Sequence, residues 1–197
     1  MIKHDIMKQI DDEVLSLKKS PLYAFRIKEK NFPVIGEGSL DTHIMFVGEA
    51  PGKNEAKKAK PFCGASGKFL TEMLSGIGID RNDVYITNLV KDRPPENRDP
   101  SPKEIALYAP FLDRQIEIIK PKVVVPLGRL SMAYLMKRFG LESELATIGK
   151  IHGKIFKVKT EYGKIHIVPL YHPAVALYNG GMRKQLHKDM AILKQFI

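Results

Sequence analysis

Residues 43–52 read HIMFVGEAPG, a short apolar run that ends in a turn containing proline and glycine. This pattern predicts a buried parallel strand over 43–49 that leads into a loop. Two further apolar runs, 84–90 (VYITNLV) and 123–128 (VVVPLG), also predict strands, and segments with helical spacing of apolar residues lie between them. Strands and helices that alternate in this way predict an α/β fold, in which helices cover both faces of a mostly parallel sheet.

Other elements follow on either side of these strands. The long helix 101–120 is marked by Ser101 as N-cap, Pro102 in the first turn and Glu104 as the capping-box carboxylate. Apolar spacing predicts helices over 2–19, 67–74, 130–139 and from 182 onward, and strands over 155–158 and 165–170. We expect a single domain over residues 1–197, in which 1–35 form an N-terminal helix and a variable segment.

Composition limits the function classes. The 197 residues include 32 Lys and Arg against 22 Asp and Glu, a formal charge of +10. A basic surface most often meets nucleic acid, an anionic membrane face or acidic small molecules, but it is also common in chains with no such partner. An apolar content of 44% excludes a disordered chain. The single Cys63 excludes a disulfide framework and fits a reducing compartment. No apolar run approaches the roughly 20 residues of a membrane span. We therefore expect a cytoplasmic protein, most simply a monomer, with no membrane contact.

Polar residues stand where the predicted strands end: Glu49, Asn88 and His172. Because the carboxyl ends of parallel strands meet at one edge of a sheet, these side chains are expected to converge on one crevice. Each residue alone is more often structural, since an Asn in an apolar strand or a His-Pro pair in a loop is common. Their combination favours a functional site.

Five motifs resemble those of a known family: GEAPG (48–52), PFCGASG (61–67), NLVKDRPPENRDPSPKEI (88–105), APFLDRQIEIIKPKVVVPLGR (109–129) and HPA (172–174). In this order they resemble the uracil-DNA glycosylase superfamily, and within it family 4. The resemblance implies a three-layer α/β/α sandwich with a central, mostly parallel four-stranded sheet. It also implies a DNA repair enzyme that flips deoxyuridine out of uracil-containing DNA and hydrolyses its N-glycosidic bond, leaving an abasic site.

The resemblance implies roles for individual residues. Phe62 would stack on the flipped base, Asn88 would pair with uracil N3 and O4, and His172 would hydrogen-bond O2. Glu49 and Glu55 occupy the positions of the two motif carboxylates of the family. One of them would position the attacking water, and the sequence leaves open which one. Glu55 can equally be a solvated carboxylate, and Phe62 a core residue.

The residues expected to contact DNA surround this pocket. Glycine-rich turns would let the backbone approach phosphates, basic side chains would bind phosphates, and the segment 175–183 would wedge into the duplex. These residues are Gly52, Lys57, Lys60, Gly64, Ser66, Leu177, Tyr178, Met182, Arg183 and Lys184. Core packing of Leu177 and a merely solvated charged face remain alternatives.

The chain departs from family 4 at its iron-sulfur cluster. The family usually holds four iron and four sulfide ions on four cysteines, and those positions here correspond to Leu17, Ser20, Asp92 and Tyr108. Without thiolates we expect no cluster, no other metal and no cofactor. Cys63 lies in the pocket loop and cannot replace four ligands. Packing of Leu17 against Tyr108 is expected to connect the segments instead.

Three alternative functions remain open. A paralogue without the cluster could bind damaged DNA without cutting it. A glycosylase could prefer hypoxanthine, xanthine or mismatched thymine, since Ala50 lines the base pocket where another branch of the superfamily has a water-activating Asp. A phosphate-binding nucleotide hydrolase would use residues 64–68, but Phe69 stands where a P-loop has its hydroxyl.

Overall fold

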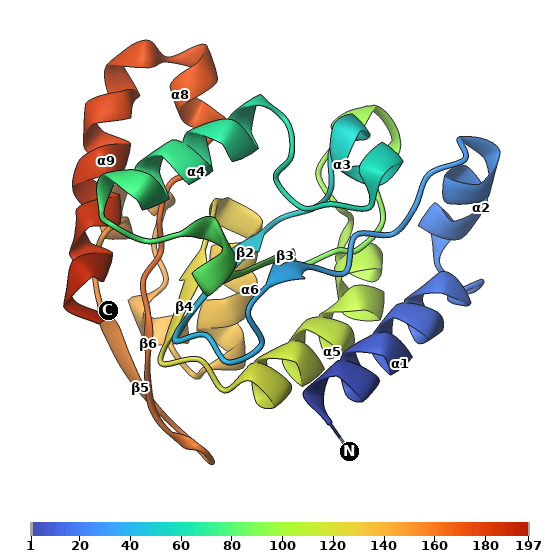
Figure 1. The fold of residues 1–197 in the computed structure, drawn as a ribbon, viewed down its shortest axis with the longest axis horizontal. Coiled ribbons are helices and arrows are strands. Elements are labelled where there is room, and N and C mark those ends of the chain that lie inside the picture. The colour runs from blue at the N-terminus through green and yellow to red at the C-terminus, as the bar shows by residue number, and fades with distance from the viewer. Residues whose placement is uncertain (1, 197) are drawn as a thin grey trace.

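The fold is built on a six-stranded sheet, whose strand order is β1-β3-β2-β4-β6-β5 (Figure 1). This computed structural model describes residues 2–196. The strands are β1 (Glu37–Gly38), β2 (Ile44–Gly48), β3 (Tyr85–Asn88), β4 (Val123–Pro126), β5 (Phe156–Thr160) and β6 (Gly163–Ile167). The central strands β3, β2, β4 and β6 are parallel, whereas β1 and β5 pair antiparallel at the two edges.

The predicted α/β class with a mostly parallel sheet is confirmed, but the predicted number of four strands is wrong. The sheet has six strands because both edges are extended. At one edge β1 has only two residues, too few for any periodicity in the sequence. At the other edge β5 and β6 form a hairpin, whose tight turn returns the chain antiparallel to itself.

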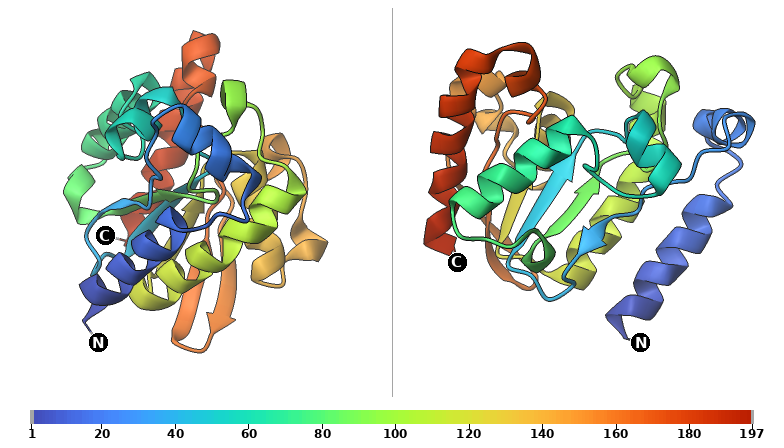
Figure 2. Two further views of the ribbon diagram at one scale, coloured as in Figure 1. Left: turned by 90° about the vertical axis from the view of Figure 1, so that its right-hand side faces the viewer. Right: turned by 45° about the horizontal axis from the view of Figure 1, so that its top comes forward.

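Helices cover both faces of the sheet (Figure 2). The α-helices are α1 (Lys3–Leu15), α2 (Pro21–Lys28), α3 (Lys53–Lys58), α4 (Ala65–Gly76), α5 (Pro102–Ile119), α6 (Arg129–Arg138), α7 (Ile148–Ile151), α8 (Val175–Tyr178) and α9 (Arg183–Ala191). Short 3-10 turns span Arg81–Asp83, Pro95–Asn97, Glu142–Glu144, Gly180–Met182 and Ile192–Phe196. Within residues 2–196 no helix is both long enough and apolar enough to cross a bilayer.

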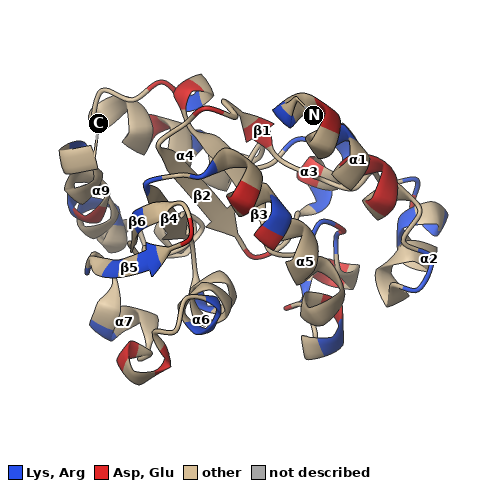
Figure 3. Cartoon of the chain, turned by 90° about the horizontal axis from the view of Figure 1, so that it is seen from below, with Lys and Arg blue, Asp and Glu red and all other residues tan. Residues whose placement is uncertain are grey.

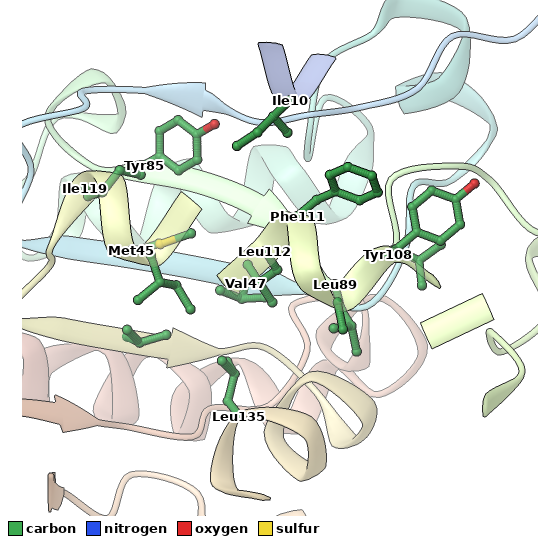
Figure 4. Packing of buried hydrophobic residues seen from close by; sticks show 14 of the residues in the cluster. Ile10, Met45, Val47, Tyr85, Leu89, Tyr108, Phe111, Leu112, Ile119 and Leu135 are labelled. Carbon is green, nitrogen blue, oxygen red and sulfur yellow. The ribbon is translucent and has the colours of Figure 1, made fainter. Parts of the chain in front are cut away.

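Two clusters of buried apolar residues lie between the sheet and its helices, one on each face of the sheet. On β2 the side chains of Met45 and Val47 join α1, α5 and α6 in one cluster, whereas Ile44 and Phe46 join α4 and α9 in the other. Figure 4 shows the first cluster, in which Val47 lies next to Leu112 of α5 and Met45 lies to their left. The alternation follows from the two-residue repeat of a strand whose faces are both covered.

The N-terminal segment differs from the predicted helix over 2–19. Helix α1 ends at Leu15, and a second helix, α2, starts after Ser20. Ser20 Oγ accepts the N–H of Leu22, and Pro21 occupies the first helical position, so this N-cap and proline restart the helix. By contrast, the capping box predicted for α5 is confirmed, with Ser101 as its N-cap.

Strand register brings the polar strand ends to one edge of the sheet. Gly48 of β2 lies opposite Asn88 of β3, and Leu127 after β4 bridges to Leu170 after β6. The residues that follow these positions therefore enclose a common space at the carboxyl edge, as expected for ligand sites in α/β sheets.

Candidate active site

A pocket of about 290 Å³ opens at this carboxyl edge. It is lined by Glu49, Ala50, Pro51, Gly52, Glu55, Phe62, Ser66, Asn88, Pro94, Asn97, Arg98, Asp99, Pro100, His172 and Ala174. All six residues predicted to act in catalysis or base binding lie in this lining, together with two of the predicted DNA-contacting residues, Gly52 and Ser66. Side chains from four separate chain segments therefore meet in one cavity.

Asn88 presents a free amide to the pocket. It is the last residue of β3 and only 2% exposed, and its side chain hydrogen-bonds to no protein group among residues 2–196. The amide fits because Gly48 on the neighbouring strand has no side chain. A methyl group at Gly48 would lie 2.3 Å from Asn88 Oδ1 and 2.8 Å from the ring of Phe62. An amide that faces the pocket without a protein partner is available to pair with a ligand there.

Phe62 is held in the pocket wall by a strained turn. Its φ is +47°, an uncommon value for a residue with a side chain, and its ring is 6% exposed. Gly67 permits this turn, since a Cβ there would lie 1.7 Å from the carbonyl oxygen of Phe62. The ring stacks on the imidazole of His172 with 5.5 Å between centroids and 30° between planes.

His172 is held as a neutral hydrogen-bond donor. Its Nδ1 accepts the backbone N–H of Ala174 at 3.1 Å, so the proton of the neutral ring belongs on Nε2. Burial lowers the pKa of His172 to about 4, against a smaller opposing effect of Glu55. At neutral pH the pocket therefore contains an uncharged imidazole with an N–H donor of fixed tautomer.

Glu49 lies between the pocket and the start of α6. Its Oε1 accepts the N–H of Leu130 at 2.8 Å, at the N-terminal end of this helix. Burial raises the pKa of Glu49, while the Leu130 hydrogen bond opposes the shift. Gly128, with φ of +101°, makes this approach possible, because a Cβ there would lie 2.7 Å from Glu49 Oε1 and 3.4 Å from His172 Cβ.

Glu55 holds the loop that carries Phe62. Its Oε1 accepts the backbone N–H groups of Cys63 at 3.0 Å and Gly64 at 2.9 Å, just before α4. The predicted alternative of a purely solvated carboxylate is therefore wrong, because the side chain is half-buried and bound to two amides. A carboxylate on two N–H donors fixes the position of a loop.

The far wall of the pocket was not predicted. It consists of the loop 94–100, in which Glu96 and Asn97 both have left-handed φ, of +55° and +56°. Arg98 ties this loop to α5 through two bonds to Glu104, at 2.8 and 2.6 Å, and Asp99 pairs with Arg129 at 2.6 Å. The sequence could have indicated this wall only by its position, since the loop comes shortly after the strand that carries Asn88.

The structure separates the residues predicted to contact DNA into two groups. Several already have protein partners: Lys57 donates to the Glu29 carbonyl, Lys60 pairs with Glu37, and Arg183 pairs with Glu72 and lies 4.2 Å from the Phe69 ring centroid. In the candidate wedge, Tyr178 and Leu177 are 89% and 46% exposed, so core packing of Leu177 is not observed, whereas Met182 packs against the core. Lys184 is exposed.

Basic and acidic residues are interspersed elsewhere on the fold. Seen from below, α1 and α5 carry both signs of charge (Figure 3). The excess of positive charge is therefore not explained by these two helices.

The four positions that the resemblance assigns to cluster ligands come together in space, but their side chains do not fit a cluster. Arg26 Nη1 lies 2.9 and 3.0 Å from the two carboxylate oxygens of Asp92, which also accepts the hydroxyl of Tyr108. The Tyr108 hydroxyl lies 2.8 Å from Ser20 Oγ. The space is thus filled by an ion pair and hydrogen bonds, and the donor set lacks the thiolates that iron-sulfur clusters require.

The predicted packing of Leu17 against Tyr108 stays a prediction. Both residues belong to the same buried cluster, and Figure 4 shows Tyr108 beside Leu89 and Phe111. The bonds that connect the segments are polar, however, and they pass through Arg26, which no sequence pattern marked. In the part of the chain that the structure describes, no group of three or more His, Cys, Asp or Glu side chains could hold a metal ion.

Known proteins resemble this chain over nearly its whole length. The profile of the Uracil DNA glycosylase superfamily matches residues 35–194. The "Type-4 uracil-DNA glycosylase" of Sulfurisphaera tokodaii is 46% identical over 192 residues, which cover 97% of this chain and 84% of the relative. Proteins of the same name from Archaeoglobus fulgidus and Thermotoga maritima are 43% and 38% identical, over 93% and 99% of this chain and 90% and 96% of the relatives.

Proposed function

This chain belongs to the uracil-DNA glycosylase superfamily, and we propose that its carboxyl-edge pocket is where it excises uracil from DNA. The reaction adds water to C1′ of deoxyuridine and breaks the bond to N1, releasing uracil and leaving an abasic site. The observation that carries the assignment to this pocket is the unpaired amide of Asn88, buried beside a neutral His172 in a cavity of about 290 Å³.

Base reading is assigned to Asn88 and Phe62. A uracil ring presents an N3–H donor and an O4 acceptor side by side, and the Asn88 amide supplies the complementary acceptor and donor. Cytosine presents the opposite pattern at these atoms, so it is rejected as long as the amide keeps the orientation that suits uracil. Phe62 provides an aromatic wall for a flipped base.

His172 stabilises the departing base. As the glycosidic bond breaks, negative charge develops on uracil O2, and the Nε2–H of the neutral imidazole is the donor placed to receive it. A fixed donor of this kind lowers a barrier by about 3 kcal/mol. With a pKa of about 4 the ring is neutral at neutral pH, and because Nδ1 accepts the N–H of Ala174, the remaining proton stays on Nε2 as the donor.

The attacking water is assigned to Glu49 rather than Glu55. One oxygen of Glu55 already accepts two backbone N–H groups, which supports a role in holding the Phe62 loop. Glu49 accepts backbone N–H groups at the start of α6, that of Leu130 on Oε1, but burial still raises its pKa, which indicates a carboxylate in a poorly solvated position. Such a carboxylate accepts a proton from a bound water more readily than an exposed one.

DNA binding is assigned to the exposed surface beside the pocket. Tyr178, fully presented on α8, is the favoured wedge, with Leu177 beside it. Lys184, Lys57 and Lys60 would bind phosphates, the last two after exchanging their present partners. We further infer that the protein works without an iron-sulfur cluster, as a monomer in the cytoplasm.

The test is release of free uracil from a deoxyuridine-containing oligonucleotide, measured for the wild type, Asn88→Ala and His172→Ala. We expect each substitution to lower the single-turnover rate by about a hundredfold or more, because each removes a donor or acceptor used in the transition state. Binding of an oligonucleotide with an abasic site should stay within a few fold. Near wild-type rates in both variants would contradict the site assignment.

A further inference from the structure

Lys91 is a buried lysine that the proposed reaction leaves unexplained. It is 0% exposed, and among residues 2–196 no carboxylate forms an ion pair with it. Burial lowers the pKa of Lys91 well below its ordinary value. A buried ammonium group lowers the stability of the fold unless each of its protons has a hydrogen-bond acceptor. The acceptors of Lys91 therefore indicate its role.

The ammonium has three acceptors for its three protons. Nζ donates to the hydroxyl of Thr87 at 2.8 Å, to Oε1 of Gln115 at 2.6 Å and to the backbone carbonyl of Asn88 at 2.7 Å. The last of these partners belongs to the residue whose amide faces the pocket. Lys91 itself does not line the pocket, so it cannot touch a bound base.

The strand geometry explains why the Asn88 carbonyl needs this donor. Leu89 donates its N–H to Gly48 across the ladder to β2, so the Asn88 carbonyl points to the opposite edge of β3. There the pairing with β1 ends at Ile86. Beyond that residue none of the strands within residues 2–196 pairs with this edge, where Val34 donates its N–H to the Lys91 carbonyl and Lys91 Nζ takes the place of a ladder N–H.

The other partners anchor the ammonium to the rigid side of the sheet. Thr87 Oγ1 and Gln115 Nε2 both donate to the carbonyl of Ile35, and Gln115 extends from α5. Tyr85 and Leu89 lie on the same side, packed toward α5 (Figure 4). The end of β3 is therefore tied through Lys91 to α5 and to the segment before β1.

We propose that Lys91 is a positioning residue, which fixes the peptide after Asn88 and thereby aims the Asn88 amide at the base. The inference rests on the proposed function of this pocket. Asn88 is the last residue of β3, and the Leu89 N–H holds the peptide that follows only on the side of β2. Without Lys91 the carbonyl of Asn88 on the other side has no donor, so this peptide can tilt and displace the side chain that shares its Cα.

A double-mutant cycle tests this role. Single-turnover uracil release is measured for the wild type, Lys91→Met, Asn88→Ala and the double variant. Methionine matches the length of lysine and removes the charge and the donors. We expect Lys91→Met to slow release about tenfold or more when Asn88 is present and less than about twofold when Asn88 is already alanine, since coupled residues are not additive. Lys164→Met, at an exposed lysine on β6, is the matched control and should leave the rate unchanged.

Equal slowing in both backgrounds would overturn the proposal, because a general structural defect lowers the rate whether or not the amide is present. Lys91→Gln keeps one donor and replaces Lys91→Met in the cycle if the latter does not fold. A rate for Lys91→Met equal to that of the wild type would also overturn it.

A second readout does not depend on activity. The Asn88 side-chain NH₂ resonances are identified in an ¹⁵N spectrum by their loss in Asn88→Ala. They should shift or broaden in Lys91→Met and stay in place in Lys164→Met. If the wild type releases no uracil, the proposed function fails, and unchanged Asn88 resonances in Lys91→Met then decide separately against the positioning role.

Discussion

Replacing Asp92 by asparagine should destabilise the fold strongly, because the change leaves a buried guanidinium without its counter-ion. Arg26 and Asp92 have side chains that are 4% and 1% exposed, and they meet at 2.9 Å. Breaking such a pair from one side costs about 3–5 kcal/mol. Arg26 keeps its bonds to the carbonyls of Val14 and Leu15, which places the expected loss for Asp92→Asn near the lower end, at about 3 kcal/mol.

Removing the charges of both Arg26 and Asp92 should lower the free energy of unfolding less than removing one of them. Burial raises the pKa of Asp92 against the opposing effects of Tyr108 and Arg26, so the ionised pair is held at a desolvation cost that the double variant avoids. In Arg26→Met with Asp92→Asn only the Val14 and Leu15 carbonyls lose a donor, at about 1 kcal/mol each or less. Arg26→Met alone leaves the Asp92 carboxylate without its counter-ion and should also cost about 3 kcal/mol. We therefore expect about 1–2 kcal/mol for the double variant, against about 6 kcal/mol for the sum of the singles.

The assay is urea unfolding at neutral pH with linear extrapolation to water. Asp12→Asn is the matched control, since Asp12 pairs with Lys8 on the surface, where the two side chains are 60% and 73% exposed. It should change the free energy of unfolding by less than about 0.5 kcal/mol. A loss below about 1 kcal/mol for Asp92→Asn, or a double variant that costs the sum of the singles, would refute the reasoning.

Three further outcomes follow from the geometry. Gly48→Ala should slow uracil release about tenfold or more, because its Cβ would lie 2.3 Å from Asn88 Oδ1. Gly76→Ala is the control, since a Cβ has room there, and it should leave the rate unchanged. Equal rates for the two variants would show that the Asn88 site tolerates displacement. The imidazole of His172 should titrate by NMR near pH 4. Since this pKa lies below the unfolded value of about 6.5, the free energy of unfolding should fall as the pH drops from 6.5 to 4. A titration near pH 6.5 would contradict the buried neutral ring. Purified protein should contain no stoichiometric iron, and EDTA should leave its melting temperature unchanged. One four-iron cluster per chain would contradict the finding that Arg26, Asp92 and Tyr108 fill the cluster position.

Local and periodic signals in the sequence were sufficient for the central sheet and for α5. The α5 start depends on residues within one turn of each other, so its capping box could be read directly. The convergence of Glu49, Asn88 and His172 followed from a general property of parallel sheets, because each comes at or after a strand end.

Features that depend on distant contacts could not be predicted. Arg26 and Asp92 are 66 positions apart, and nothing near either residue marks it as half of an ion pair. Gly48 was predicted only as a residue of the strand 43–49, but its importance is the clearance it leaves for a side chain on the next strand. Likewise Lys91 looks like a surface lysine until the pairing of β3 with β1 is seen to end at Ile86.

The most direct test of the central claim is release of free uracil from a deoxyuridine-containing oligonucleotide by the purified protein, with its iron content measured on the same sample. The pocket formed by Asn88, His172 and Glu49 predicts stoichiometric release, with an abasic site left in the strand and no dependence on iron. Tight binding of the oligonucleotide without any released uracil would contradict it.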